Sequence, residues 1–319
     1  MKTRICSCLV SWSFLIGGAA FGDGRIIAIG DEWLLSDAAF SNQPAQTKQL
    51  TDNIANFFSQ GVPSRFLVYS TSPAIAGYGK RGVLADGLAN RMAALGHTWE
   101  INSALPFTLA NLKNYQAVFL SGTAGSGSAN GLVLQQYVNQ GGNVLITAGT
   151  GDQGSSGAEA SSWNGFLNHF GLAFGDTYFA TGGNLLNVPT LPSTNPLGKF
   201  ITMIEWGYGQ NVTNVQPDNP TVELAVYGNF NGFSPLLASG PIQPVIGTVN
   251  ITTKCLGDFN GDGFVDDADF VIFVAAYNLL TCDDPAMPPG CPADIYLDGL
   301  IDDRDFIIFS QSYNLLFCP

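Results

Sequence analysis

The chain has 319 residues, which is enough for one sizeable α/β domain and a small second module. Its formal net charge is −13, and most of that charge is local: residues 255–319 hold 12 acids and one base, a net of −11, whereas residues 1–254 hold 13 acids and 11 bases, a net of −2. An acidic segment attracts cations and repels phosphate backbones, so we expect a metal ligand and no nucleic-acid partner.

The first 22 residues have the pattern of a secretory signal peptide. Lys2 and Arg4 give a basic start, and an apolar run follows over residues 5–20, with small residues near its end. The run is too short and too early in the chain for a membrane-spanning helix. We therefore expect a cleaved signal peptide at 1–22, no membrane span, and a mature protein that is secreted, either extracellular or at the cell surface, where disulfides form.

Residues 23–247 alternate between two hydrophobic patterns. Short continuous apolar runs, typical of buried strands, are followed by segments of helical spacing. The expected strands are 25–30, 64–71, 97–102, 116–122 and 143–149, and the expected helices are 47–59, 83–95, 109–115, 132–139 and 163–170. Apolar strands that alternate with helices predict an α/β domain, built on a parallel sheet that is covered on both faces.

After residue 174 the pattern changes. Helical spacing becomes rare, Asn, Pro and Gly become frequent, and short β-like runs appear, such as 199–206 and 222–228. We expect a β-rich completion of the same domain up to residue 247, followed by a linker at 248–254.

The succession FLSG followed by YVNQGGNVLI resembles the class I glutamine amidotransferase-like, or ThuA-like, fold of the flavodoxin type, over about residues 24–180. In catalytic relatives a cysteine nucleophile lies in the turn after the strand that here ends at Leu120. This chain has Ser121, Gly122 and Thr123 at that turn and no cysteine in residues 23–247. The amidotransferase mechanism is therefore excluded, and the resemblance implies a fold rather than an activity.

Ligands of such sheets bind at the carboxyl ends of the strands. The polar side chains expected on that rim are Asp31, Glu32, Ser121, Thr123, Thr150, Asp152 and Glu159. The candidate catalytic residues are Asp31, Glu32 and Ser121. Two carboxyls about 5–5.5 Å or 6.5–9.5 Å apart would suit hydrolysis of O-glycosyl bonds, although adjacent residues at a strand end usually diverge and Asp31 equally suits a turn cap.

Two other arrangements remain open on the sequence. A serine hydrolase would need a base near Ser121, and the only histidines are His97, which begins a strand at the opposite edge, and His169, at a helix end. We therefore do not expect a Ser–His pair. Four aromatic residues suit either a core or a platform for stacking sugars: Trp33, Trp163, Trp206 and Tyr208.

Two 12-residue segments near the end of the chain repeat each other at a spacing of 36 residues: DFNGDGFVDDAD from 258 and DIYLDGLIDDRD from 294. Ca²⁺ takes about 6–8 oxygen ligands, and an EF-hand loop supplies them from positions 1, 3, 5, 7, 9 and 12, with Gly at position 6. The predicted ligands are Asp258, Asn260, Asp262, Phe264 (carbonyl), Asp266 and Asp269 in the first loop, and Asp294, Asp298, Leu300 (carbonyl), Asp302 and Asp305 in the second. Because Tyr296 stands at position 3 of the second loop, we expect two calcium sites of which the second is weaker.

Each calcium loop leads directly into the same helical pattern, DFVIFVAAYNLL in the first copy and DFIIFSQSYNLL in the second. Phe270, Phe273, Tyr277 and Leu280 lie at helical spacing in the first copy. The segments before the loops are too short and too rich in Gly and Pro for an entering helix. The tail is therefore expected to be loop–helix twice, a small all-α module.

This arrangement, with Asp at loop position 12, resembles a type I dockerin, the calcium-dependent docking module of secreted polysaccharide-degrading systems. The resemblance covers about residues 255–319 and implies a cohesin-like protein as partner. The partner-binding residues that it implies in the first copy are Asp267, Ala268, Val274 and Ala275. Their counterparts in the second copy differ, so a second, rotated binding mode is not expected.

Four cysteines of this module also repeat at 36 residues: Cys255 and Cys291 precede the loops, and Cys282 and Cys318 follow the helices. A helix of about 12 residues is about 18 Å long, whereas a disulfide joins Cα atoms about 4.4–6.8 Å apart. Pairing within one repeat is therefore too distant. If the two helices are antiparallel, each loop start meets the end of the other helix, which predicts Cys255–Cys318 and Cys282–Cys291.

The sequence favours an exported protein in which a calcium-binding module docks a binding domain without a complete catalytic constellation into a polysaccharide-processing or cell-surface assembly. Two alternatives stay open. One is an active polysaccharide hydrolase that uses the rim carboxylates, with polysaccharide as a direct partner. The other is a calcium-stapled structural protein without a cohesin partner.

Overall fold

The structure of the protein is a computed structural model that describes residues 24–70, 80–122, 129–149, 155–180, 185–231, 242–251, 257–260, 262, 264–288, 291–296 and 299–313. The expected signal peptide at 1–22 lies outside these residues. Within them, no helix has both the length and the apolar character that crossing a bilayer requires.

A seven-stranded sheet forms the centre of the α/β domain, in the order β12-β13-β1-β5-β4-β2-β3. Its strands are β1 (Gly24–Ile29), β2 (Arg65–Val68), β3 (Thr98–Ile101), β4 (Ala117–Ser121), β5 (Asn143–Thr147), β12 (Val222–Asn229) and β13 (Ile242–Ile251). The five strands from β1 to β3 in this order are mutually parallel, and β12 and β13 are antiparallel. Every residue of β4 and β5 is buried, as their continuous apolar runs predict for strands covered on both faces.

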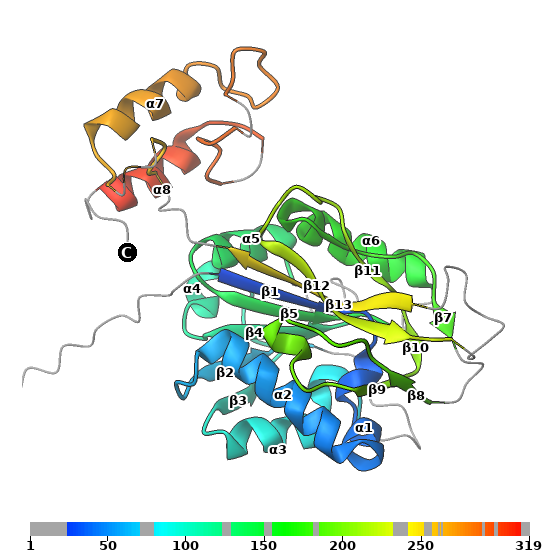
Figure 1. Ribbon diagram of the computed structural model, residues 1–319. Helices are drawn as coiled ribbons and strands as arrows, with labels where there is room; N and C mark the ends of the chain where they lie inside the picture. The colour runs from blue at the N-terminus through cyan, green and yellow to red at the C-terminus, as the bar shows by residue number, and fades with distance from the viewer. Residues whose placement is uncertain are drawn as a thin grey trace, which may run out of the picture.

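Two groups of helices cover the two faces of the sheet (Figure 1). The helices are α1 (Asp37–Asn42), α2 (Pro44–Ser59), α3 (Asp86–Ala94), α4 (Leu109–Leu112), α5 (Gly131–Asn139) and α6 (Ser156–Leu167). Side chains of α2 and α3 pack with Phe66 and Phe119, whereas those of α5 and α6 pack with Val118 and Leu120 on the other face. The chain reverses direction along the sheet after β3, and right-handed crossovers then place the later helices on the opposite face.

The expected change to β-rich structure after residue 174 is confirmed. Three two-stranded ladders follow the helices, formed by β6 (Leu172–Phe174) with β11 (Val212–Asn214), β7 (Phe179–Ala180) with β10 (Tyr208–Gly209), and β8 (Leu186–Pro189) with β9 (Met203–Trp206). Short 3₁₀ turns connect elements at η1 (Glu32–Leu35), η2 (Gly82–Leu84), η4 (Asn168–Phe170) and η5 (Pro196–Gly198). Phe179 stacks on Trp206, with ring centroids 5.0 Å apart, which fixes this part against the α2 side of the sheet.

Two expected boundaries are wrong. The predicted linker at 248–254 begins too early, because residues 248–251 are the last part of β13. All four pair with β1, and Thr248 and Val249 also pair with β12. The helix expected at 163–170 begins instead at Ser156. Ser155 caps it by accepting a hydrogen bond from Ala158 N at 3.2 Å, and the first turns are too rich in small residues to show apolar spacing.

The C-terminal module contains the two expected helices, α7 (Asp267–Tyr277) and α8 (Asp303–Tyr313). They are antiparallel, as expected: the Tyr277 hydroxyl at the end of α7 donates to Asp303 at the start of α8, at 2.7 Å, and the Tyr313 hydroxyl donates to Asp267. The small core includes stacked rings of Phe259, Phe273 and Phe309.

The predicted bond between Cys282 and Cys291 is present, with Cα atoms 5.4 Å apart. The other predicted pair, Cys255 and Cys318, lies outside the described residues.

The place of residues 248–251 in the sheet can be tested with one buried and one exposed substitution. Val249 is 1% exposed, so Val249→Asp leaves a buried charge without a partner and is expected to lower the free energy of unfolding by about 3 kcal/mol or more. Asn250 is exposed and accepts a hydrogen bond from Arg25 Nε at 3.1 Å, so Asn250→Asp is expected to be tolerated. Chemical denaturation of both variants is the measurement. If both variants changed the free energy of unfolding by a similar, small amount, residues 248–251 would not be part of the sheet.

Candidate functional site

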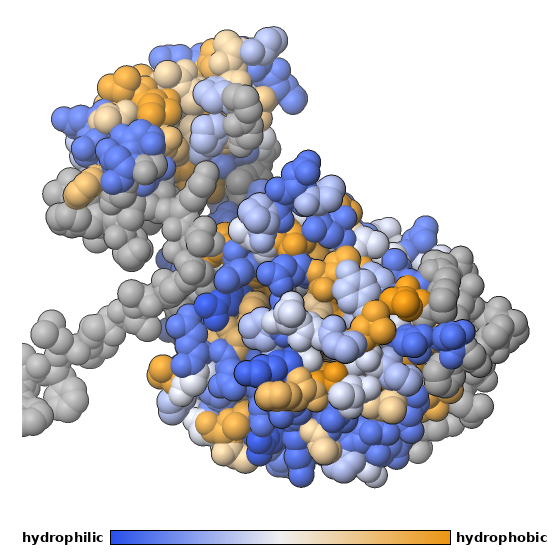
Figure 2. All heavy atoms as spheres, viewed as in Figure 1, coloured by the Kyte–Doolittle hydropathy of each residue, from blue (hydrophilic) through white to orange (hydrophobic). Residues whose placement is uncertain are grey.

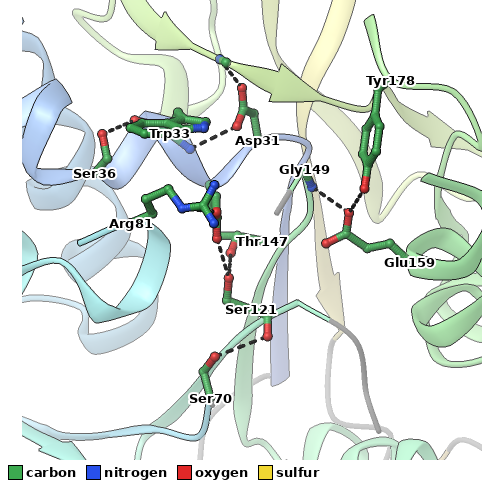
Figure 3. Close-up of polar contacts among 12 residues, drawn as sticks. Asp31, Trp33, Ser36, Ser70, Arg81, Ser121, Thr147, Gly149, Glu159 and Tyr178 are labelled. Carbon is green, nitrogen blue, oxygen red and sulfur yellow. Dashed lines mark hydrogen bonds and ion pairs between the residues drawn. The ribbon is translucent and has the colours of Figure 1, made fainter. Parts of the chain in front are cut away.

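The candidate catalytic residues of the α/β domain meet at the carboxyl edge of the sheet. Ser121 ends β4, Asp31 and Glu32 follow β1, and Thr147 ends β5. Arg81 immediately precedes η2 and comes to the same edge from the chain that follows β2. Figure 3 shows Asp31, Arg81, Ser121 and Thr147 near one another at the strand ends. Parallel strands bring their carboxyl ends together, which is why residues so far apart in sequence become neighbours.

Glu32 is held from two sides. Its Oε1 forms an ion pair with Arg81 Nε at 2.8 Å, and its Oε2 accepts a hydrogen bond from Ser121 Oγ at 3.1 Å. The Thr147 hydroxyl in turn donates to Ser121 Oγ at 2.8 Å. The guanidinium of Arg81 lies over the Trp33 ring, 5.3 Å from its centroid. This Glu32 cluster, comprising Glu32, Arg81, Ser121 and Thr147, joins the ends of β1, β4 and β5 to η2.

Gly82 is part of this packing. Its φ of +54° is in the left-handed region that L side chains rarely adopt, and a Cβ there would lie 3.1 Å from both the Ser121 hydroxyl and Glu32 Cβ. The glycine therefore allows the chain after Arg81 to lie directly against the Glu32 cluster.

Asp31 points away from its neighbour Glu32. One carboxylate oxygen accepts from Trp33 N at 3.0 Å and the other from Gly207 N. Burial raises the pKa of Asp31 to about 8, while the two backbone N–H groups and Arg81 oppose the rise. The side chain thus caps η1 and ties it to the turn after β9, which is the capping alternative rather than the catalytic one.

Glu159 forms a third buried carboxylate at this edge. Its Oε2 accepts hydrogen bonds from Gly149 N at 3.0 Å and from the Tyr178 hydroxyl at 2.9 Å. Gly149 has φ +77°, and a Cβ at that position would lie 2.8 Å from Tyr208 O, so close packing of the backbone requires the glycine. The other expected rim residues, Thr123, Thr150 and Asp152, lie outside the described residues.

This geometry does not favour hydrolysis by Asp31 and Glu32. Asp31 is 0% and Glu32 1% exposed, and each is bound to separate partners, so the described residues contain no open pair of carboxyls at this edge. A Ser–His pair is also absent from the part of the chain that the structure describes. His97 Nδ1 accepts from Ser64 N at 3.1 Å at the amino end of β3, and His169 lies in η4.

The three tryptophans considered as a sugar platform belong to the core. Trp33, Trp163 and Trp206 are 5%, 1% and 0% exposed, respectively, so their faces do not present a stacking surface. Tyr208 is exposed, but none of the three tryptophans is exposed to form a platform with it. The core alternative therefore holds.

Sequence reasoning missed Arg81, Thr147 and Tyr178. Thr147 lies inside an expected strand, and Tyr178 follows a segment without periodicity. Arg81 lies in a glycine-rich stretch without helical or strand spacing, so its role depends on a contact across 49 residues of chain. The available signal was its position after a buried strand, on the rim where Glu32 also lies.

The first predicted calcium loop wraps around the carboxylate at its last position. Asp269 is fully buried and accepts hydrogen bonds from Phe259 N at 2.7 Å, Asn260 N at 3.1 Å and Asp266 N at 3.1 Å. Asp266 caps the start of α7 in a capping box with Asp269. The described backbone of the loop is thereby curved about the first turn of the helix.

The donor set of the first loop fits calcium. One carboxylate oxygen from each of Asp258, Asp262 and Asp269 lies within 4.8 Å of the others. Asn260 offers a further oxygen at loop position 3, and the Phe264 side chain is 46% exposed, as expected for a residue that would contribute only its carbonyl. Hard oxygen donors at this density suit a hard divalent cation and would repel one another without one.

The described residues of the second loop repeat the backbone contacts to the carboxylate at the last position. Asp305 is fully buried and accepts from Tyr296 N at 2.7 Å and Asp302 N at 2.9 Å, and Asp294 accepts from Gly299 N at 2.9 Å. Leu300 forms a β-bridge with Thr281. Asp298 lies outside the described residues, so the full ligand set of this loop is not described.

The four implied partner-binding residues, Asp267, Ala268, Val274 and Ala275, are all exposed on α7. Apolar side chains beside them are exposed as well, with Phe270 at 40% and Val271 at 67%. Figure 2 shows apolar residues on the outside of this module next to hydrophilic ones. Of the residues at helical spacing in the first copy, Phe273 is buried, whereas Phe270 and Leu280 are exposed.

A scan against protein-family models gives no match for this chain. A search of curated proteins gives none either. The function of the chain is therefore inferred from its residues and their geometry.

The Glu32–Arg81 ion pair is expected to be structural and can be tested by removing its cation. Arg81→Met leaves Glu32 buried without its countercharge and should lower the free energy of unfolding by about 3–5 kcal/mol. The double variant Arg81→Met, Glu32→Gln should regain much of that loss because no charge remains buried. Arg65→Met is the control, since Arg65 and Glu100 form an exposed pair at 3.1 Å and should contribute at most about 1 kcal/mol. If Arg81→Met lowered the free energy of unfolding no more than Arg65→Met does, a structural role of the Glu32–Arg81 pair would be refuted.

The raised pKa of Asp31 predicts a pH dependence of stability. Because the folded state holds this proton up to about pH 8 while the unfolded chain releases it near the ordinary value of 3.8, the contribution of Asp31 to stability should fall as pH rises between these values. The difference in unfolding free energy between the wild type and Asp31→Asn should then shift toward the variant by up to about 1.4 kcal/mol per pH unit. Denaturant titrations from pH 4 to 9 measure it. A difference that stays constant over this range would mean that Asp31 titrates normally.

Proposed function

We propose that residues 255–319 are a calcium-binding, dockerin-like module that docks the α/β domain to a cohesin-like protein. The observation that carries the proposal is the first loop, where Asp258, Asp262 and Asp269 gather their oxygens within 4.8 Å at the start of α7. The repetition of the same loop wrap before α8 supports it, because two loop–helix repeats in antiparallel order match the arrangement that the sequence pattern implies.

The exposed side of α7 is the proposed partner surface. Asp267 and Ala268 lie at the helix start and Val274 and Ala275 about two turns later, so all four lie on the side of the helix that the module leaves exposed. The exposed Val271 adds apolar area to the same helix. An interface of this kind would combine an apolar centre with an acidic rim.

We infer a binding role without catalysis for the α/β domain. Its strand order supports a flavodoxin-type assignment: counted from β2, the order β3-β2-β4-β5 is 2-1-3-4, and β1 takes the fifth position. The amidotransferase-like nucleophile position holds Ser121, which is 3% exposed and engaged with Glu32. An exported protein in a polysaccharide-processing or cell-surface assembly is consistent with the signal-peptide pattern and with the Cys282–Cys291 disulfide, since such bonds persist outside the reducing cytosol.

Calcium binding is tested by calorimetric titration of the full chain with its disulfides formed. We expect saturable calcium binding, and Asp262→Ala should weaken the tighter site on the order of tenfold because it removes one charged ligand. Asp283→Ala removes the same charge from an exposed position outside the loops and should change the affinity little.

Docking is tested on the same preparations with a panel of cohesin domains. Val274→Asp should reduce cohesin binding while leaving calcium affinity intact, and a chelator should abolish it. Calcium binding without any cohesin binding would favour the calcium-stapled structural alternative. The absence of calcium binding would overturn the proposed function.

A further inference from the structure

The described residues of the two calcium loops share backbone contacts to the last carboxylate, but their side chains differ at two positions of interest. Loop position 3 is Asn260 in the first loop and Tyr296 in the second, and loop position 11 is Ala268 in the first and Arg304 in the second. The backbone at position 11 is equivalent: Ala268 N donates to Asp266 and Arg304 N donates to Asp302, both at 2.8 Å. The difference between the loops is therefore in the side chains and not in their framework.

The Arg304 side chain folds back over its own loop. Its Nη2 lies 2.7 Å from Asp302 Oδ2, and its Nε lies 3.2 Å from Oδ1 and 3.1 Å from Oδ2 of the same carboxylate. The guanidinium carbon lies 4.8 Å from the centroid of the Tyr296 ring. Both oxygens of Asp302 thus contact the guanidinium of Arg304. The ring of Tyr296, which replaces the ligand at loop position 3, contacts the same guanidinium.

The charge composition of the module restricts this arrangement to the second loop. Arg304 is the one base among the 12 acids of residues 255–319. In the first loop the equivalent carboxylate, Asp266, has alanine two residues later, so that loop has no side-chain cation at position 11. The first loop depends on an external cation for the charge that the second loop receives in part from Arg304.

Main-chain contacts also hold the second loop from outside. Cys282 N donates to Gly299 O at 3.0 Å and Ile301 N donates to Leu280 O at 3.0 Å, which pairs the end of this loop with the chain after α7. The disulfide between Cys282 and Cys291 anchors that chain three residues before Asp294. These restraints need no metal ion.

We propose that Arg304 is a built-in cation of the second loop, which competes with calcium for Asp302 and leaves the first loop as the main calcium-responsive element of the module. This inference rests on the proposed calcium-binding function. It identifies Arg304 and Tyr296 together as the residues that set the difference in affinity between the two loops.

A reciprocal exchange at position 11 tests the proposal in the full chain with its disulfides formed. Calcium titration by calorimetry should resolve a stronger and a weaker site in the wild type. Arg304→Ala should strengthen the weaker site about fivefold and leave the stronger site unchanged, because an exposed ion pair of this kind corresponds to a change of that size. Ala268→Arg should weaken the stronger site by a similar factor.

Hydrogen exchange supplies a second measurement that does not depend on fitting two sites. On adding a chelator, amides of 258–269 should lose far more protection than those of 294–305 in the wild type. In Arg304→Ala the amides of 294–305 should become sensitive to the chelator as well.

The outcomes separate this inference from the function on which it rests. Calcium binding that both variants leave unchanged, or equal loss of protection in the two loops of the wild type, would overturn the role of Arg304 while leaving the calcium module in place. A full chain that binds no calcium in either measurement would overturn the calcium function, and the inference with it.

Discussion

A buried ion pair between Glu32 and Arg81 organises the edge of the sheet at which an α/β domain of this kind would bind a ligand. Removing two charges from water costs several kcal/mol for each ion, so such a pair persists only when its remaining hydrogen bonds are satisfied. Here Ser121 and Thr147 extend the contacts to the ends of β4 and β5, and Trp33 covers the guanidinium. In the described residues this edge is a closed polar core. Side chains with catalytic chemistry are present, but they are used to hold strands and turns together.

The C-terminal module differs from the α/β domain in that it has many charged residues and a small core. The rings of Phe259, Phe273 and Phe309 fill its centre, while most of its acids lie at the loops and helix starts. In the α/β domain, the buried carboxylate of Glu32 has its counter-charge in Arg81. In the module as proposed, an external cation would compensate the charge of the first loop. The two parts would thus differ in the source of their counter-charge, which is a side chain in the α/β domain and a solvent cation in the module.

Local patterns predicted much of this molecule, and long-range contacts account for what they missed. The buried strands and most helices follow from apolar runs and helical spacing, and the clustering of Asp258, Asp262 and Asp269 follows from oxygen side chains at fixed positions. The start of α6 at Ser156 was missed because its first turns have no apolar spacing. The end of β13 was missed although Val249 and Ile251 alternate with Thr248 and Asn250, a period-two signal that identifies a strand.

The candidate site was harder to predict than the fold. The rim positions of Asp31, Glu32 and Ser121 follow from strand ends, but their orientation does not. The sequence does not reveal that Asp31 turns to Gly207 N or that Glu32 finds Arg81, since both contacts depend on how distant segments pack. The contacts of Arg304 are more local. Its ion-pair partner, Asp302, is two residues away, and Tyr296, whose ring it contacts, lies in the same loop.

The first and last strands of the α/β domain are antiparallel neighbours, and Gly24 lies opposite Ile251. The domain therefore starts and finishes at one point of its sheet. A domain with adjacent termini can be inserted into a longer chain, or exchanged for another, without displacing what lies on either side. In a multidomain protein, residues 24–251 could therefore be exchanged for another domain while residues 255–319 kept their place in the chain.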